Sequence, residues 1–282
     1  MVKFGSHAYL WIDEWTTEKG NYAIAATAKT GFDLIEMPLL KPQEFDAAAH
    51  KKALHEAGIE GTTTLVLPND CHLPFQPQKA KQFLLGALEK VEAVGSTFLG
   101  GCIAYALGVF TNQPPTAAER QAVVDVIGEV AVAAKKRGIT LGFETVNRYE
   151  SYLYNTLADG RATIKAIGAD NIVLHPDTYQ MNIEEEGFYR PLVECADVLG
   201  YIHISESHRG LVGTGTINWD EVFQALADAH FNGPMVLESF LAINPDLVAA
   251  TKLWRPPNQP SEVLAGEGLK FMRAKAEQFG LN

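Results

Sequence analysis

Short apolar runs alternate with longer amphipathic stretches along the whole chain. The runs carry apolar residues at nearly every position, as in ITLGFE at residues 139–144, and this density is typical of strands that are buried on both faces. Several amphipathic stretches end in a glycine, such as Gly58 or Gly138, directly before the next apolar run. Glycine adopts the left-handed conformation that follows a helix without strain. The pattern therefore predicts strands and helices in regular alternation.

Eight of the apolar runs are expected to form strands. They lie at residues 3–11, 32–36, 59–67, 96–101, 139–144, 171–177, 199–205 and 234–238. Strands that alternate with helices are joined by right-handed crossovers into a parallel sheet. A length of 282 residues is also typical of one eight-stranded barrel. We predict an α/β fold in which residues 1–282 form a single (β/α)8 TIM barrel domain.

The stretch at residues 116–138 shows how local signals define one helix. Thr116 and Glu119 have the spacing of a capping box. Val123 and Ile127 begin an apolar stripe at helical spacing, which predicts one face packed inward. Basic residues follow at 135–137, where positive charge is favourable at a helix C-terminus. We expect Gly138 to end the helix.

Composition narrows the class of protein. The chain is 47% hydrophobic and 20% charged, as in ordinary globular proteins. Its formal net charge of −11 repels polyanions, so we expect no nucleic-acid partner and no membrane partner. The first residues show no secretory signal pattern. The three cysteines form no CxxC pair, as expected for reduced thiols. Together these features predict a cytoplasmic location.

Four residues with ligand chemistry each end an apolar run. They are Glu144, Asp177, His203 and Glu238. In an eight-stranded α/β barrel, the C-terminal strand ends meet at one rim. Three carboxylates and an imidazole would repel one another there unless a divalent cation neutralised them. The set suits Mn²⁺, Mg²⁺ or Co²⁺ better than Zn²⁺, which prefers more His or Cys ligands.

Such a site has the equipment to move a proton next to a carbonyl group. A divalent cation polarises a carbonyl and an adjacent hydroxyl together. Two carboxylates on opposite sides of a carbon can then remove and return its proton. The residues alone therefore predict proton abstraction through an enediolate.

Several motifs resemble those of the ketose 3-epimerase family, which includes the D-tagatose/D-allulose and L-ribulose 3-epimerases and has a xylose isomerase-like barrel. The matching segments are ETVNRYE (144–150), DTYQMNIEE (177–185), HISESHRG (203–210), VLESF (236–240), YLWIDEW (9–15) and FDLIEMPL (32–39). They follow the family's order and span nearly the whole chain. The resemblance implies metal-dependent epimerisation at C3 of free ketoses such as D-tagatose, D-allulose, D-fructose or L-ribulose, through a cis-enediolate.

The resemblance also implies residue roles. Glu144, Asp177, His203 and Glu238 would bind the metal, for which Mn²⁺ is expected, with Mg²⁺ or Co²⁺ as alternatives. Glu144 and Glu238 would also act as the acid/base pair on the two faces of C3. Glu150 would reach in from the loop after its strand and, with Arg209, hold hydroxyl groups of the ketose. Members of this family suggest a homodimer or homotetramer.

Further residues are expected around the substrate. Glu36 either contacts the sugar or fixes the metal ligands through a hydrogen bond. Trp11 and Trp15, with Tyr9, are interpreted as an apolar wall against the sugar, although packing at the barrel mouth is the alternative. His7 is counted with the substrate-binding residues, and a structural position is its alternative.

Gln180 is a departure from the family pattern, which usually has a substrate-contacting His at this position. An amide still donates to a hydroxyl but cannot titrate. We therefore expect activity to survive with a changed substrate preference or rate.

A Gly-rich loop at residues 210–219 lies where barrels often bind phosphate. Arg209 is its only nearby cation in the sequence, so we interpret it as a turn leading into a helix.

Three other functions remain open. An aldose–ketose isomerase would use the same barrel and metal site, and it is the main alternative. A DNA-repair barrel of the endonuclease IV type would need a basic face and more His ligands, which the net charge of −11 disfavours. A barrel that binds metal or sugar without catalysis is favoured only by Gln180.

Overall fold

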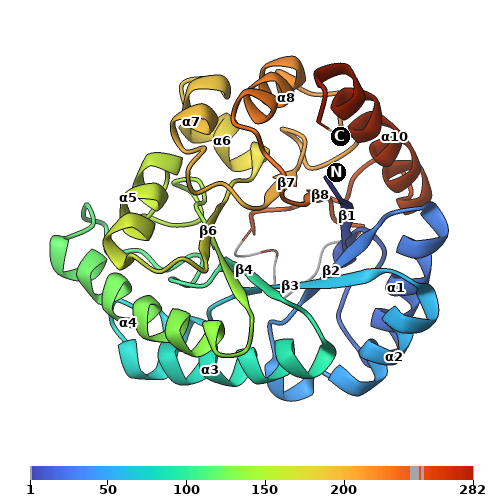
Figure 1. The fold of residues 1–282 in the computed structure, drawn as a ribbon. Coiled ribbons are helices and arrows are strands. Elements are labelled where there is room, and N and C mark those ends of the chain that lie inside the picture. The colour runs from blue at the N-terminus through green and yellow to red at the C-terminus, as the bar shows by residue number, and fades with distance from the viewer. Residues whose placement is uncertain (1, 242–247, 249–250, 282) are drawn as a thin grey trace.

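The computed structural model describes residues 2–241, 248 and 251–281, and it confirms the predicted TIM barrel. Eight parallel strands surround the centre, and helices form an outer ring around them (Figure 1). The strands are β1 (Phe4–His7), β2 (Leu34–Pro38), β3 (Glu60–Val66), β4 (Phe98–Cys102), β5 (Thr140–Glu144), β6 (Ile172–His175), β7 (Ile202–Ile204) and β8 (Met235–Leu237). Each of the eight predicted runs overlaps one of them, and β2 and β4 extend one or two residues beyond the ends of their runs.

The helices follow the strands in alternation. They are α1 (Thr17–Thr30), α2 (Ala47–Ala57), α3 (Pro77–Val94), α4 (Ala117–Lys135), α5 (Leu157–Ile167), α6 (Thr178–Glu184), α7 (Tyr189–Glu194), α8 (Trp219–Asp228) and α10 (Ser261–Phe279), with short 3-10 turns η1 (Ala8–Leu10), η2 (Pro42–Glu44) and η3 (Asn69–Cys71). In the described ranges, none of the helices is long and apolar enough to cross a bilayer.

The barrel closes between β6 and β7. The hydrogen-bonded order is β6-β5-β4-β3-β2-β1-β8-β7, and isolated parallel bridges pair Leu174 with Leu199 and Asp177 with His203 across the remaining seam. The backbone N–H of His203 donates to the carbonyl of Pro176 at 2.9 Å. The closure therefore holds Asp177 and His203 side by side.

Inside the barrel, a layer of polar side chains lies next to a layer of apolar side chains. Leu34, Phe98, Tyr201 and Val236 form a buried apolar cluster of their own, in which the rings of Phe98 and Tyr201 stack at 4.2 Å. Side chains two residues apart share a face of a strand. The positions after Leu34, Tyr201 and Val236 on this face are Glu36, His203 and Glu238, so these polar groups lie one step nearer the C-terminal rim.

Two further predicted boundaries differ from the structure. The capping box of Thr116 and Glu119 is present, but α4 ends at Lys135, and Gly138 (φ 68°) instead closes the tight turn that follows. The first apolar run leaves the extended conformation after His7, because its ring Nδ1 accepts a hydrogen bond from the Tyr9 N–H at 3.2 Å and starts the η1 turn. Trp11 therefore lies beyond the strand.

Candidate active site

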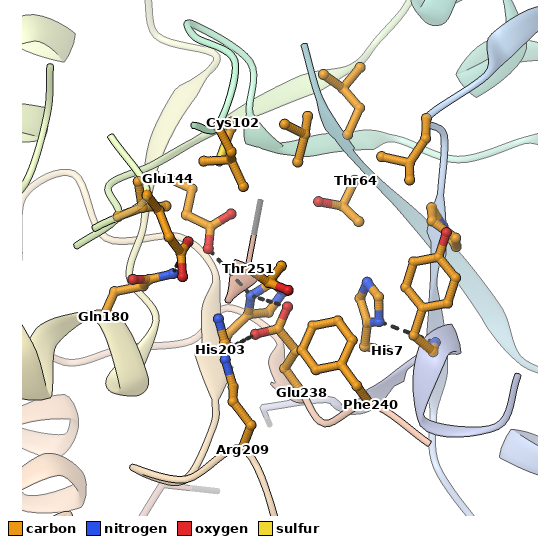
Figure 2. A pocket seen from close by; sticks show the side chains of 18 residues that line it. His7, Thr64, Cys102, Glu144, Gln180, His203, Arg209, Glu238, Phe240 and Thr251 are labelled. Atoms are coloured by element: carbon orange, nitrogen blue, oxygen red, sulfur yellow. Dashed lines mark hydrogen bonds and ion pairs between the residues drawn. The ribbon is translucent and has the colours of Figure 1, made fainter. Parts of the chain in front are cut away.

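The four predicted metal ligands meet at the C-terminal rim of the barrel. Figure 2 shows three of them, Glu144, His203 and Glu238. Glu144 is the last residue of β5, His203 lies in β7, and Glu238 directly follows β8. Asp177 is the N-cap of α6, and its side chain accepts a hydrogen bond from the Tyr179 N–H at 2.8 Å. All four ligands are at most 8% exposed.

A cavity with about 530 Å³ of empty space opens at this rim. Its lining includes the predicted residues His7, Tyr9, Glu144, Glu150, Gln180, His203, Arg209 and Glu238, together with Thr64, Cys102, Phe240 and Thr251. Asp177 and Glu36 are 0% exposed and lie behind this surface.

The nitrogen and oxygen atoms of the ligands converge on a small volume. His203 Nδ1 lies 3.7 Å from Glu144 Oε1 and 3.6 Å from Glu238 Oε1. One donor atom each from Glu144, Asp177 and His203 lies within 4.8 Å of the other two. His203 Nδ1 is buried and accepts no hydrogen bond from the described residues. The cluster thus offers three carboxylates and one imidazole nitrogen that has no hydrogen-bond partner among the described residues. This donor set matches the one that a hard divalent cation prefers.

Glu36 sets the orientation of His203. Both oxygens of the Glu36 carboxylate face His203 Nε2, at 2.9 and 3.1 Å. Burial opposes ionisation of Glu36, but His203 and His7 outweigh it and lower the pKa of this carboxyl. A carboxylate only accepts, so Nε2 carries a proton and Nδ1 is the nitrogen directed at the cluster. Of the two predicted roles for Glu36, the hydrogen bonds to His203 favour the one in which Glu36 orients a proposed metal ligand.

Arg209 supplies the positive charge within the cluster. Its Nη1 lies 2.9 Å from Asp177 Oδ2 and also pairs with Glu238 Oε2. The guanidinium carbon lies 3.9 Å from the ring centroid of Tyr179, in cation–π contact. The backbone of Arg209 is left-handed, with φ of 59°, a conformation that costs a non-glycine residue about 1–3 kcal/mol. The structure therefore holds this side chain in place at a conformational cost.

The surroundings shift the pKa values of the carboxyl groups in the cluster in opposite directions. Burial raises the pKa of Glu144, and it raises that of Asp177 to about 8. Burial also opposes ionisation of Glu238, but Arg209 and His203 outweigh it and lower the pKa of Glu238 to about 2. Burial likewise disfavours a charged His203, yet Glu36 and Glu238 raise its pKa well above the ordinary value. Protons thus partly neutralise the cluster.

Glu150 reaches the cavity from the β5–α5 loop and is held by two amides. The Gln180 amide nitrogen donates to Glu150 Oε2 at 3.0 Å, and Asn147 Nδ2 donates to Glu150 Oε1 at 3.1 Å. The Gln180 amide oxygen in turn accepts from the Asn147 N–H at 2.8 Å. Burial raises the pKa of Glu150 to about 7, although Arg209 and the amides oppose the shift. Gln180 therefore links α6 to the loop that carries Glu150.

The expected aromatic wall needs a correction. Tyr9 lines the cavity, but neither Trp11 nor Trp15 is among its described lining residues. Trp11 is 5% exposed and donates from its indole nitrogen to Ser6 Oγ at 3.1 Å. Trp15 stacks on Phe45 with ring centroids 5.8 Å apart. Both indoles are turned away because the η1 turn ends the first strand before they are reached.

His7 and two unpredicted residues, Phe240 and Asn147, lie around the site. His7 lines the cavity, and its Nε2 lies 3.7 Å from Glu36 Oε1. Phe240, which was noted only as part of a family motif, forms a wall beside His7 with ring centroids 5.9 Å apart. Asn147, whose role was not predicted, positions both Glu150 and Gln180. Asn147 occupies a fixed place in the ETVNRYE motif, and that place is the signal that could have identified it.

The comparisons with known proteins agree with this site. The sequence model of the family "Xylose isomerase-like TIM barrel" matches residues 24–275. The chain is 34% identical to the ketose 3-epimerase of Arthrobacter globiformis, over 97% of this chain and 96% of the relative. It is also 34% identical to the L-ribulose 3-epimerase of Methylomonas sp. (strain DH-1), over 97% of this chain and 98% of the relative.

Solved structures show the same architecture. The crystal structure of D-allulose 3-epimerase from Methylomonas sp. in complex with D-allulose superposes with a TM-score of 0.93 at 34% identity, over 97% of each chain. A structure of an L-ribulose 3-epimerase gives a TM-score of 0.94 at 30% identity, over 99% of this chain and 96% of the other. The chain therefore belongs to the xylose isomerase-like TIM barrel family and, within it, to the ketose 3-epimerases.

Proposed function

We propose that this protein epimerises free ketoses at C3 in a divalent-metal-dependent reaction. The observation that carries the proposal is the placement of Glu144 and Glu238. Glu144 ends β5 and Glu238 directly follows β8. Both line one cavity and lie 3.7 and 3.6 Å from the same His203 nitrogen. Figure 2 shows the two carboxylates approaching His203 from different sides. A substrate carbon held between them would face one carboxyl group on each side.

The chemistry follows from two carboxyl groups in different protonation states. One carboxylate accepts the proton of C3. The C–H electron pair forms a C2–C3 double bond while the π pair of the C2 carbonyl moves onto its oxygen, which gives a cis-enediolate. The other carboxyl group then donates its proton to the opposite face of C3, which inverts this carbon. Arg209 and the Glu150–Gln180 pair would hold the hydroxyl groups during these transfers.

A bound divalent cation would add polarisation of the ketose carbonyl and stabilisation of the developing negative charge. Glu144, Asp177, His203 and Glu238 would hold it. The oxygen-rich donor set is the reason for proposing Mn²⁺, with Mg²⁺ or Co²⁺ as alternatives.

The substrate class rests on the relatives. Proteins named ketose, L-ribulose and D-psicose 3-epimerase match 90–97% of this chain, and one solved relative holds D-allulose. We therefore propose ketoses of the D-allulose, D-tagatose, D-fructose or L-ribulose type. We further propose that residues 1–282 act as one catalytic domain in a cytoplasmic homodimer or homotetramer.

An assay in D₂O tests the proposal. Metal-loaded protein is incubated with a panel of four- to six-carbon ketoses, products are separated by chromatography, and the position of deuterium is determined by NMR. A C3 epimer with deuterium at C3 is expected. Formation of an aldose would instead support the aldose–ketose isomerase, and absence of turnover with metal bound would refute both enzymes.

A further inference from the structure

Glu206 is a buried carboxylate that the proposed reaction does not use. It belongs to the segment HISESHRG (203–210), between His203 and Arg209, and lies in the loop that joins β7 to α8, residues 205–218. Its side chain is 0% exposed and is not among the described residues that line the reaction cavity. A buried charge is costly unless hydrogen bonds compensate for it, so the contacts of Glu206 should reveal its role.

Neutral donors from the whole length of this loop converge on the carboxylate. Glu206 Oε1 accepts from the N–H and the hydroxyl of Ser207, at 2.8 and 3.1 Å, and from the Ile217 N–H at 3.5 Å. Glu206 Oε2 accepts from the Gly213 N–H at 2.8 Å and from the indole N–H of Trp219 at 3.1 Å. Burial opposes ionisation of Glu206, but these hydrogen bonds outweigh it and lower its pKa. One carboxylate thus ties the start, the middle and the end of the loop together.

The glycines of the loop make this arrangement possible. A Cβ atom at Gly215 would lie 2.3 Å from Glu206 Oε1, so only glycine lets the backbone pass this close to the carboxylate. Gly213 has a left-handed backbone, with φ of 82°, which glycine adopts without strain. The loop then enters α8, as predicted for residues 210–219. Its glycines therefore serve to wrap the chain around its own carboxylate.

The same loop sets the unusual backbone of Arg209. The Arg209 N–H donates to the carbonyl oxygen of Glu206 at 2.8 Å, and the Ser239 hydroxyl donates to the carbonyl oxygen of Arg209 at 2.6 Å. With φ of 59°, Arg209 extends its guanidinium to Asp177 and Glu238 in the cavity. A strained conformation of this kind persists only when the surrounding structure holds it. Here the turn at residues 206–209 does so.

We propose that Glu206 is a positioning residue for the reaction and acts through Arg209. This inference rests on the proposed C3 epimerisation, in which Arg209 holds hydroxyl groups of the ketose. Loss of the carboxylate would leave buried N–H donors without an acceptor. The loop would then open, the backbone of Arg209 would relax to negative φ, and its guanidinium would leave the cavity. A purely structural Glu206 would instead stabilise α8 without regard to Arg209.

A double-mutant cycle separates these two roles. Glu206→Gln replaces one acceptor oxygen by an NH₂ group that faces N–H donors. We expect kcat/KM of the metal-loaded protein for its fastest ketose to fall by about tenfold or more. In an Arg209→Ala background the same change should cost less than about twofold, because the group through which Glu206 acts is gone. Equal losses in both backgrounds would overturn the proposal.

Trypsin gives a second readout that does not depend on turnover. The enzyme cuts after arginine, and Arg209 is only 5% exposed. Cleavage of the bond between Arg209 and Gly210 is followed by mass spectrometry on the native protein. Because local opening exposes a bond to protease, we expect cleavage at least about tenfold faster in Glu206→Gln. An unchanged rate would show that Glu206 does not hold Arg209 in place.

Glu221→Gln is the matched control. Glu221 is a partly buried carboxylate of α8 that accepts from the N–H groups of Phe188 and Tyr189, at 2.8 and 2.9 Å. It therefore ties α8 to the segment before α7, and it has no contact with Arg209 among the described residues. Its kcat/KM and its cleavage after Arg209 should match the wild type within about twofold. Losses as large as those of Glu206→Gln would mean that any weakening of α8 has this effect, which would overturn the positioning role.

The outcomes also separate this inference from the proposed function. If the wild type epimerises ketoses and Glu206→Gln keeps its kcat/KM, the positioning role fails and the epimerase stands. If the wild type turns over no ketose, the proposed function fails, and the cleavage rates alone decide whether Glu206 holds Arg209.

Discussion

The role of Glu36 gives the sharpest test of the metal site. This side chain is 0% exposed, and both of its oxygens face His203 Nε2, at 2.9 and 3.1 Å. Glu36→Gln keeps the shape and one hydrogen-bond acceptor but removes the negative charge. His203 would become a weaker metal ligand, since a carboxylate partner raises the basicity of an imidazole and fixes its orientation.

The expected loss of metal affinity follows from the role of Glu36 in orienting His203. Substitution of a residue that orients a metal ligand typically costs 10- to 100-fold in metal affinity. This corresponds to about 1.4–2.7 kcal/mol of binding free energy. We expect the lower end for Glu36→Gln, because the amide oxygen still accepts from His203. Glu36→Ala removes the acceptor as well and should lie nearer the upper end.

The measurement is the Kd of Mn²⁺ by titration calorimetry on chelator-treated, dialysed protein. Glu185→Gln is the control, because Glu185 is a partly buried carboxylate that accepts from the Leu157 N–H at 2.7 Å and is not among the described lining residues of the cavity. Its Kd should match the wild type within about twofold. An unchanged Kd in Glu36→Gln would refute the reasoning. If KM for the ketose rose at the same time, Glu36 would be a sugar contact.

The remaining predictions concern the acid/base residue Glu238, the protonation of buried carboxyl groups in the site, and Gln180. Glu238→Gln should lower the epimerisation rate by about 10²–10⁴-fold without changing the circular dichroism spectrum, and near-normal deuterium incorporation would contradict its role. Burial raises the pKa of Asp177 to about 8 and that of Glu150 to about 7, whereas it lowers the pKa of His7, His50, His72 and His175. These histidines are neutral in both states above about pH 6.5, so between about pH 6.5 and pH 8 the metal-free folded protein holds more protons than the unfolded chain. Its thermal midpoint should fall as pH rises through this window, and Mn²⁺ should restore it most at pH 8; a midpoint that rises with pH would exclude these shifts. Gln180→His should change the kcat/KM ratio among ketoses and destabilise the protein by about 1 kcal/mol, because one imidazole nitrogen cannot accept both Asn147 donors; identical ratios and stability would make this position peripheral.

The fold and the convergence of the four proposed metal ligands were predictable because their signals are local. Dense apolar runs, a capping box and terminal glycines act over a few residues, and they define where strands and helices occur. Parallel strands in a barrel place their C-terminal ends at one rim whatever the details of packing. Glu144 and His203 could therefore be assigned to one site from the positions of their runs alone.

The positions of the supporting side chains depend on contacts between distant segments. The sequence by itself determined the eight strands, the rim and the carboxylates that meet there, because strand periodicity and chain order fix them. Only the tertiary structure decided that Glu36 pairs with His203, 167 residues away, and that Trp15 stacks on Phe45 outside the cavity. Loop paths and side-chain directions arise from packing between segments far apart in the chain, and no local pattern encodes them.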